Sequence, residues 1–226
     1  MNNFDFETLR RSFLCKDIAL LKSNTTKLIE TLLEASDFNI QAYFHPLGFV
    51  YAKLYEFENM ETIRIHIWNR KYYENKAQME IHNHYYIVNS FLYRGCINNN
   101  IYRPDEENGE TYAIYNGAYN SKGDRILQRS SKQISLSLSN TDLHCENELY
   151  QIPIDTIHSG HPDGEGMVCT VVYTEKPGVP TPLVVGPLNG ELEYNFPNKA
   201  VDHSIFKKVL AELMSFNKVP EKDNKD

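Results

Sequence analysis

Two segments of the sequence carry histidines in patterns that suit metal binding. The first reads Glu-Ile-His-Asn-His and contains Glu80, His82 and His84. On a β-strand alternate side chains share one face, so these three side chains would point the same way. The second segment contains Pro153 and, five residues later, His158. Imidazoles bind zinc, copper, iron and nickel, and two of them one residue apart on a strand lie close enough to bind one ion.

Both segments lie in a stretch that predicts a β-rich domain. Over residues 43–185 apolar and polar side chains alternate, and turn signals such as Asn108-Gly109 separate the runs. Strands are expected at 49–57, 63–68, 79–87, 91–101, 111–115, 133–139, 149–154 and 167–174. Many short strands without intervening helices predict an antiparallel sandwich or barrel.

Helical patterns flank this stretch. Residues 4–35 repeat apolar side chains three and four apart, which predicts two helices, and Asp17 is positioned to cap the second. Residues 200–216 predict one amphipathic helix. The chain of 226 residues is therefore expected to comprise an N-terminal helical extension at 1–40, a β-barrel at 41–190, and a C-terminal helix with a charged tail at 191–226.

The composition narrows the classes of partner. The net charge of −7 argues against nucleic-acid binding, because neutralising phosphates supplies most of that affinity. The best apolar run, at 167–173, has seven residues, whereas a membrane-spanning helix needs about 20. The N-terminus lacks the pattern of a signal peptide. We therefore expect a cytoplasmic protein that binds neither nucleic acid nor membranes.

The four cysteines lie far apart in the sequence. Cys15, Cys96, Cys145 and Cys169 form no Cys-x-x-Cys pair that would indicate a zinc or redox centre. In a chain without a secretion signal, we expect all four thiols to stay reduced.

Together the two histidine segments resemble the signature of the cupin superfamily of small β-barrels. The first cupin motif is His-x-His followed by a glutamate and then a glycine, and His82, His84 and Gly95 match it. The second motif places a proline a few residues before a third histidine, as Pro153 and His158 do. The resemblance implies a mainly β fold, a cupin-type double-stranded β-helix (jelly-roll) barrel with N-terminal helices and a C-terminal helix.

The resemblance also implies that His82, His84 and His158 bind a metal ion in the barrel mouth. The glutamate of the motif would fall on Val88 or Asn89, and neither is a carboxylate. Three histidines without a carboxylate resemble the sites of thiol dioxygenases and some diketone dioxygenases. That variant implies iron(II), with zinc, nickel or manganese as alternatives, and leaves three positions open on an octahedral ion.

Three further residues are candidate catalytic groups. Glu80 would share the face of the two nearby histidines and serve as a fourth ligand or as an acid–base group. Arg64 alternates with isoleucines on the preceding strand. It would bind a substrate carboxylate if its face points inward, although the isoleucines favour an outward orientation. Tyr173 would, by the resemblance to thiol dioxygenases, lie on the distal side of the barrel and position substrate or dioxygen.

We expect simpler roles for two other histidines. His161 follows His158 by three residues and would flank the pocket or compete with His158 as a ligand. His45 precedes the first strand of the barrel, and we expect it to be a structural histidine bonded to the backbone.

Three functional hypotheses follow. The first is an iron(II)-dependent oxygenase or dioxygenase that acts on a small molecule. The second is a metal-assisted isomerase, lyase or hydrolase in which the ion acts as a Lewis acid. The third is a non-catalytic small-molecule-binding barrel, because fold alone does not determine function. Pairing into a homodimer is compatible with all three.

Overall fold

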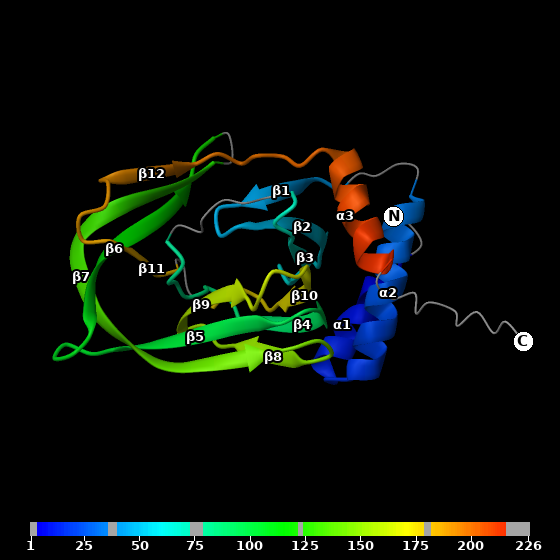
Figure 1. The fold of residues 1–226 in the computed structure, drawn as a ribbon, viewed down its shortest axis with the longest axis horizontal. Helices are drawn as coiled ribbons and strands as arrows, with labels where there is room; N and C mark the ends of the chain where they lie inside the picture. Colours follow the sequence, from blue (N-terminus) through cyan, green and yellow to red (C-terminus); the bar gives the residue numbers. More distant parts are fainter. Residues whose placement is uncertain (1–3, 36–39, 73–78, 122–123, 179–181, 216–226) are drawn as a thin grey trace, which may run out of the picture.

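The protein is mainly β, as the sequence predicts. The computed structural model describes residues 4–35, 40–72, 79–121, 124–178 and 182–215. Within these ranges two curled sheets form the body of the molecule, two helices precede them, and one helix follows them (Figure 1). The expected barrel-like architecture with N-terminal helices and a C-terminal helix is confirmed. The charged tail expected after the C-terminal helix, at 218–226 within the segment 191–226, lies outside the described residues.

Each N-terminal helix begins at an aspartate. Helix α1 (Phe6–Leu14) follows Asp5 and α2 (Ile18–Glu34) follows Asp17. Both carboxylates accept hydrogen bonds from backbone N–H groups of the first turn, which satisfies donors that a helix start otherwise leaves unpaired. The cap predicted at Asp17 is confirmed. Helix α3 (His203–Ser215) is the predicted C-terminal helix.

The first sheet has β10 (Val168–Thr174) near its centre, paired antiparallel with both of its neighbours. Across the sheet the strands are β1 (Ala42–His45), β2 (Phe49–Glu56), β3 (Thr62–Trp68), β10, β4 (Val88–Arg94) and β8 (Leu149–Ile152). We call it sheet A.

The second sheet, sheet B, contains the long strand β7 (Arg125–His144). Across it the strands are β11 (Val184–Gly186), β6 (Glu110–Tyr119), β7, β5 (Ile97–Pro104) and β9 (Ile157–Pro162), and β12 (Glu193–Phe196) also pairs with β7. Its two edge strands, β9 and β11, are joined by bridges to residue His82. The segment around His82 therefore links the two edges of this sheet.

The three helices pack on the outer face of sheet A (Figure 1). On β3, Ile63, Ile65 and Ile67 are buried in this helix–sheet core, whereas Arg64 and His66 line the interior. The outward orientation expected for Arg64 is wrong. The apolar face of β3 does mark a core, but that core lies under the helices, and the polar face points into the barrel.

Two expected strands differ in the structure. Residues 79–87 form no regular strand and make only isolated bridges at His82. The strand expected at 91–101 is two strands, β4 and β5, separated at Gly95 and Cys96. Gly95 has a φ of +74°, and a Cβ there would lie 2.8 Å from Cγ2 of Val168. The turn between the two strands therefore requires glycine.

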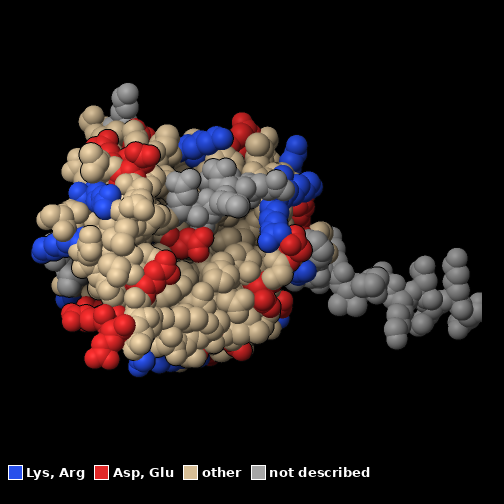
Figure 2. Space-filling model, turned by 60° about the vertical axis from the view of Figure 1, so that its left-hand side comes forward, with Lys and Arg blue, Asp and Glu red and all other residues tan. Residues whose placement is uncertain are grey.

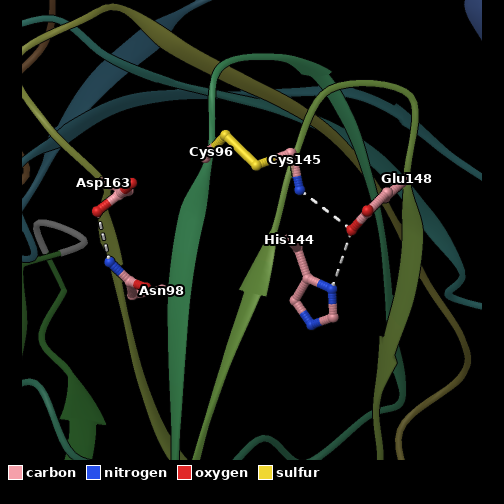
Figure 3. Close-up of a disulfide and its surroundings, with 6 residues drawn as sticks. All are labelled: Cys96, Asn98, His144, Cys145, Glu148 and Asp163. Carbon is pink, nitrogen blue, oxygen red and sulfur yellow. Dashed lines mark hydrogen bonds and ion pairs between the residues drawn. A yellow bond between two sulfur atoms is a disulfide. The ribbon is translucent and has the colours of Figure 1, made fainter.

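Cys96 and Cys145 form a disulfide that joins the ends of β5 and β7 (Figure 3). The expectation that all four thiols stay reduced is wrong for this pair, because strand pairing brings together residues 49 positions apart in sequence. Cys15 and Cys169 are free, the first exposed and the second buried. Disulfides persist mainly in oxidising compartments, and the cytoplasmic location stays a prediction.

In the described part of the chain, every helix is too short or too polar to cross a membrane.

A partly buried ion pair connects α1 to sheet A. Arg10 Nε lies 2.6 Å from Glu61 Oε2, and the Glu61 side chain is 11% exposed. Burial alone would raise the pKa of Glu61, but hydrogen bonds from Arg10 and Tyr173 outweigh it and the pKa lies below its ordinary value. The helical layer is therefore attached to the sheet by a charged contact as well as by apolar packing.

Replacing Glu61 by glutamine is expected to lower the free energy of unfolding by about 1–3 kcal/mol at neutral pH, because Arg10 loses its charged partner. The pKa of Glu61 is lowered on folding, so this stabilisation is complete above the ordinary value of 4.5 and is lost as the pH falls through the folded-state pKa. Urea unfolding of both proteins across acidic pH checks this. Glu56→Gln, which removes an exposed partner of Lys53, is the control and should cost little. A Glu61→Gln deficit that persists undiminished in acid would contradict the assignment.

Cys145→Ser is expected to lower the free energy of unfolding by about 2–4 kcal/mol, because the disulfide closes a long loop in the unfolded chain. Denaturant unfolding in the absence of reductant measures the loss. Cys15→Ser, at an exposed free thiol, should leave stability unchanged. Equal stability of the oxidised parent and Cys145→Ser would show that the disulfide contributes nothing.

Candidate metal centre

Backbone pairing places His82 and His158 side by side. The N–H of His82 donates to the carbonyl of His158 at 2.9 Å, and the N–H of His158 donates to the carbonyl of His82 at 2.8 Å. On the other side, the N–H of Asn83 donates to the carbonyl of Leu183 at 3.0 Å. Opposed residues of an antiparallel bridge project their side chains to the same face. The two histidines therefore point into the same space although they are far apart in sequence.

The third histidine completes a cluster. Nε2 of His84 lies 3.0 Å from Nε2 of His158. The ring centroid of His82 lies 4.8 Å from those of both other rings, and one ligand atom from each histidine lies within 4.8 Å of the others. Imidazole nitrogens bind zinc at about 2.0–2.1 Å, so two neighbouring ligands of one ion lie roughly 3 Å apart. The spacing of His84 and His158 fits that requirement.

Hydrogen bonds to the outer ring nitrogens set the tautomers of two histidines. Nδ1 of His82 lies 2.7 Å from the backbone carbonyl of Glu80, and Nδ1 of His158 lies 2.8 Å from Oδ1 of Asn99. A carbonyl oxygen can only accept, so each Nδ1 carries the proton and donates it. This leaves a lone pair on Nε2, which is the state a metal ligand needs.

Burial keeps all three imidazoles neutral. It is the main cause that lowers the pKa of His82 to about 4 and the pKa values of His84 and His158 well below the ordinary range. Neighbouring histidines lower the last two further. Neutral imidazoles bind metal ions without first releasing a proton.

The cluster borders two interior spaces. His82 and His84 line a cavity of about 670 Å³. All three histidines line a smaller space of about 100 Å³ between the sheets. Apolar and hydroxyl side chains form much of the lining of the smaller space, including Val88, Ile97, Tyr150, Ile152, Thr170 and Val172. A site at the junction of these spaces adjoins the larger cavity through His82 and His84, and that cavity has room for a ligand.

Arg64 lies next to the histidine cluster. Its Nη1 donates to the hydroxyl of Tyr86 at 2.7 Å and its Nε donates to Oγ1 of Thr62 at 2.9 Å. The ring of Tyr86 stacks on that of His84, with centroids 5.6 Å apart. The structure thus brings Arg64 together with the histidines, and holds its guanidinium in one orientation.

The structure does not bring three other candidates to the cluster. Glu80 is exposed and contributes its backbone carbonyl to His82 rather than its carboxylate. Tyr173 lies on the opposite face of sheet A, in the core beneath the helices and beside Phe13, because only alternate residues of β10 face the interior. His161 is exposed, since three positions on a strand separate it from the inward-facing His158.

His45 matches its expectation in part. Its Nδ1 accepts a hydrogen bond from the backbone N–H of Leu47 at 3.2 Å, as a structural histidine would. It also lines the larger cavity and stacks on Phe49, with ring centroids 4.4 Å apart.

Sequence reasoning missed Asn99 and Arg125. Asn99 is buried and orients His158, and Arg125 lines the larger cavity. A signal for Asn99 existed, because the run Asn98-Asn99-Asn100 is unusual in a strand. Arg125 carried no such signal. Of Val88 and Asn89, the two positions where the resemblance would place a glutamate, Val88 lines the interior and offers an apolar side chain there.

No protein-family model matches the sequence, and no curated protein matches it either. The assignment of a metal site therefore rests on the residues themselves. The donor set fits a metal ion because the imidazoles are neutral, their free nitrogens converge, and acceptors on the outer side hold two of the rings. Among the described residues, His82, His84 and His158 are the only group of histidine, cysteine or acidic side chains placed to share one ion.

Asn99→Ala is expected to weaken metal binding by about 10–100-fold, because the Nδ1–H of His158 loses its acceptor and the ring loses its orientation. Titration with zinc in competition with a chromophoric chelator measures the change. Asn98→Ala is the matched control, since Asn98 is the adjacent residue on β5 and its side chain donates to Asp163. Equal affinity in the two variants would show that Asn99 does not support the site.

Proposed function

We propose that the protein is a metal-dependent cupin enzyme, specifically a non-haem iron(II) oxygenase or dioxygenase that acts on a small molecule. The observation that carries this proposal is the convergence of three neutral imidazoles beside a cavity of about 670 Å³. The barrel-like β fold and the motif residues Gly95, Pro153 and His158 support the cupin assignment.

The chain's own residues would bind the ion and orient the substrate. His82, His84 and His158 would hold the ion, with Asn99 and the carbonyl of Glu80 fixing two of the rings. Bound iron(II) would supply the one-electron chemistry that dioxygen needs, and three protein ligands leave positions open for small molecules. Arg64 would orient a substrate group that accepts hydrogen bonds, and the apolar walls near Val88 would exclude water.

The same three histidines could bind a metal other than iron. Three imidazoles suit zinc and nickel as well as iron, and manganese is the remaining alternative. Retention of zinc, nickel or manganese would favour a metal-assisted isomerase, lyase or hydrolase, in which the ion polarises the substrate.

Replacing His158 by alanine is expected to abolish metal retention and oxygen uptake, because the cluster loses the ligand that pairs with His84. Elemental analysis of protein purified without added metal or chelator, followed by an oxygen-electrode assay with thiols and with carbonyl acids of increasing size, checks both. His161→Ala is the matched control, because it removes an exposed histidine of the same strand. It should keep the metal content and activity of the parent.

Two results would overturn the proposal. One is full metal content in His158→Ala and in His84→Ala, with both variants folded by circular dichroism. The other is a parent protein that binds no metal even when iron(II) is supplied anaerobically, which would make the histidines structural and favour a non-catalytic binding protein.

A further inference from the structure

The larger cavity has a charge opposite to that of the protein. The chain carries a net charge of −7, and acidic and basic side chains mix on the face shown in Figure 2. The described residues that line the cavity include Lys53, Arg64 and Arg125 but no aspartate or glutamate. Lys53 pairs with Glu56, which is exposed. The cavity is therefore a locally positive chamber in an acidic protein, and it favours anions.

Two guanidinium groups reach this chamber from the two sheets. Arg64 comes from β3 of sheet A and Arg125 from the first residue of β7 in sheet B. Both lie near enough to His45 to lower its pKa, after the larger effect of burial. Arg64 is held by Tyr86 and Thr62. Arg125 forms no ion pair or side-chain hydrogen bond with any residue in the described ranges, so its donors are available to a ligand.

The walls of the chamber are aromatic. Tyr43, Phe49, Tyr51, Tyr85 and Tyr86 line it, together with the ring of His45. Flat rings of this kind pack favourably against another flat ring. They would also attract a cation, but the arginines oppose one.

The size of the chamber excludes the smallest acids as a good fit. Its volume of about 670 Å³ lies in the range of roughly 300–1,000 Å³ typical of sites for drug-sized ligands. A two- or three-carbon acid would leave most of it empty and most of the aromatic wall without contacts.

We infer that the substrate is a planar aromatic carboxylate, whose carboxylate pairs with Arg125 and whose ring lies between the aromatic walls. A guanidinium binds a carboxylate through two parallel N–H···O hydrogen bonds. This inference names the substrate class for the cavity beside the histidines, and as a statement about substrate it rests on the proposed function. As a statement about binding it does not need the metal.

Three matched probes separate the contribution of the ligand's negative charge to binding from that of its aromatic rings. They are 2-naphthoate, its neutral isostere 2-naphthamide, and the saturated acid decahydro-2-naphthoate. Isothermal titration calorimetry on chelator-treated, metal-free protein should show 2-naphthoate binding at least about tenfold more tightly than either of the others. Binding of 2-naphthamide as tight as that of 2-naphthoate would overturn the role of the charge. Equal binding of the saturated acid would overturn the role of the aromatic walls.

Variants of Arg125 test whether this residue supplies the positive charge that binds the carboxylate. Arg125→Gln should lose the preference for 2-naphthoate over 2-naphthamide, and Arg125→Lys should keep part of it. Arg103→Gln, which removes an exposed arginine on β5, should keep all of it. A full preference in Arg125→Gln, with the variant folded by circular dichroism, would overturn the assignment.

The same measurements distinguish failure of this inference from failure of the proposed function. A protein that retains no metal but binds 2-naphthoate through Arg125 would contradict the metal-dependent enzyme and support the anion site. A protein that retains iron through His158 but shows no preference among the probes would support the metal-dependent enzyme and contradict the anion site.

Discussion

The paired backbone hydrogen bonds between His82 and His158 are the constraint on which the site depends. They fix two segments from distant parts of the chain in register, so that the side chains of both residues project into the same space. His84 follows two positions later and joins them through its Nε2. A shift of one residue in this register would turn His82 and His84 together away from His158. The geometry of the cluster is thus set by main-chain pairing, and the metal-binding chemistry of the side chains follows from it.

Much of the architecture could be predicted because it depends on local patterns. The helices were recognised from apolar spacing and from Asp17, and most strands from alternation. The histidines were found because their spacing is short and distinctive. Residues 79–87 were one exception, since an extended segment with isolated bridges has nearly the same alternation as a regular strand. The distinction depends on partners elsewhere in the chain, which local spacing does not contain.

Orientation within the fold was the harder question. Alternation on β3 identifies two faces of the strand but does not show which face lies inside the barrel. Here the helices form a second core with sheet A, and the isoleucines of β3 are buried in that core. Arg64 therefore faces inward and, by the same rule on β10, Tyr173 faces the helices. The pairing of Cys96 with Cys145 depends on strand neighbours, so a single sequence gives no direct sign of it. The run Asn98-Asn99-Asn100 marks Asn99 as unusual but does not show that it contacts His158.

The central position of β10 also has a consequence for how the protein folds. Oγ1 of Thr174 lies 2.6 Å from Oγ1 of Thr62, across a sequence separation of 112 residues, and β10 fills the place between β3 and β4. Before β10 pairs with β3 and β4, these two strands are not joined, and the helices lack the complete surface on which they pack. Contacts at such separation slow folding, because the chain loses much entropy before they form. During synthesis the surface under the N-terminal helices is therefore complete only after β10 has left the ribosome.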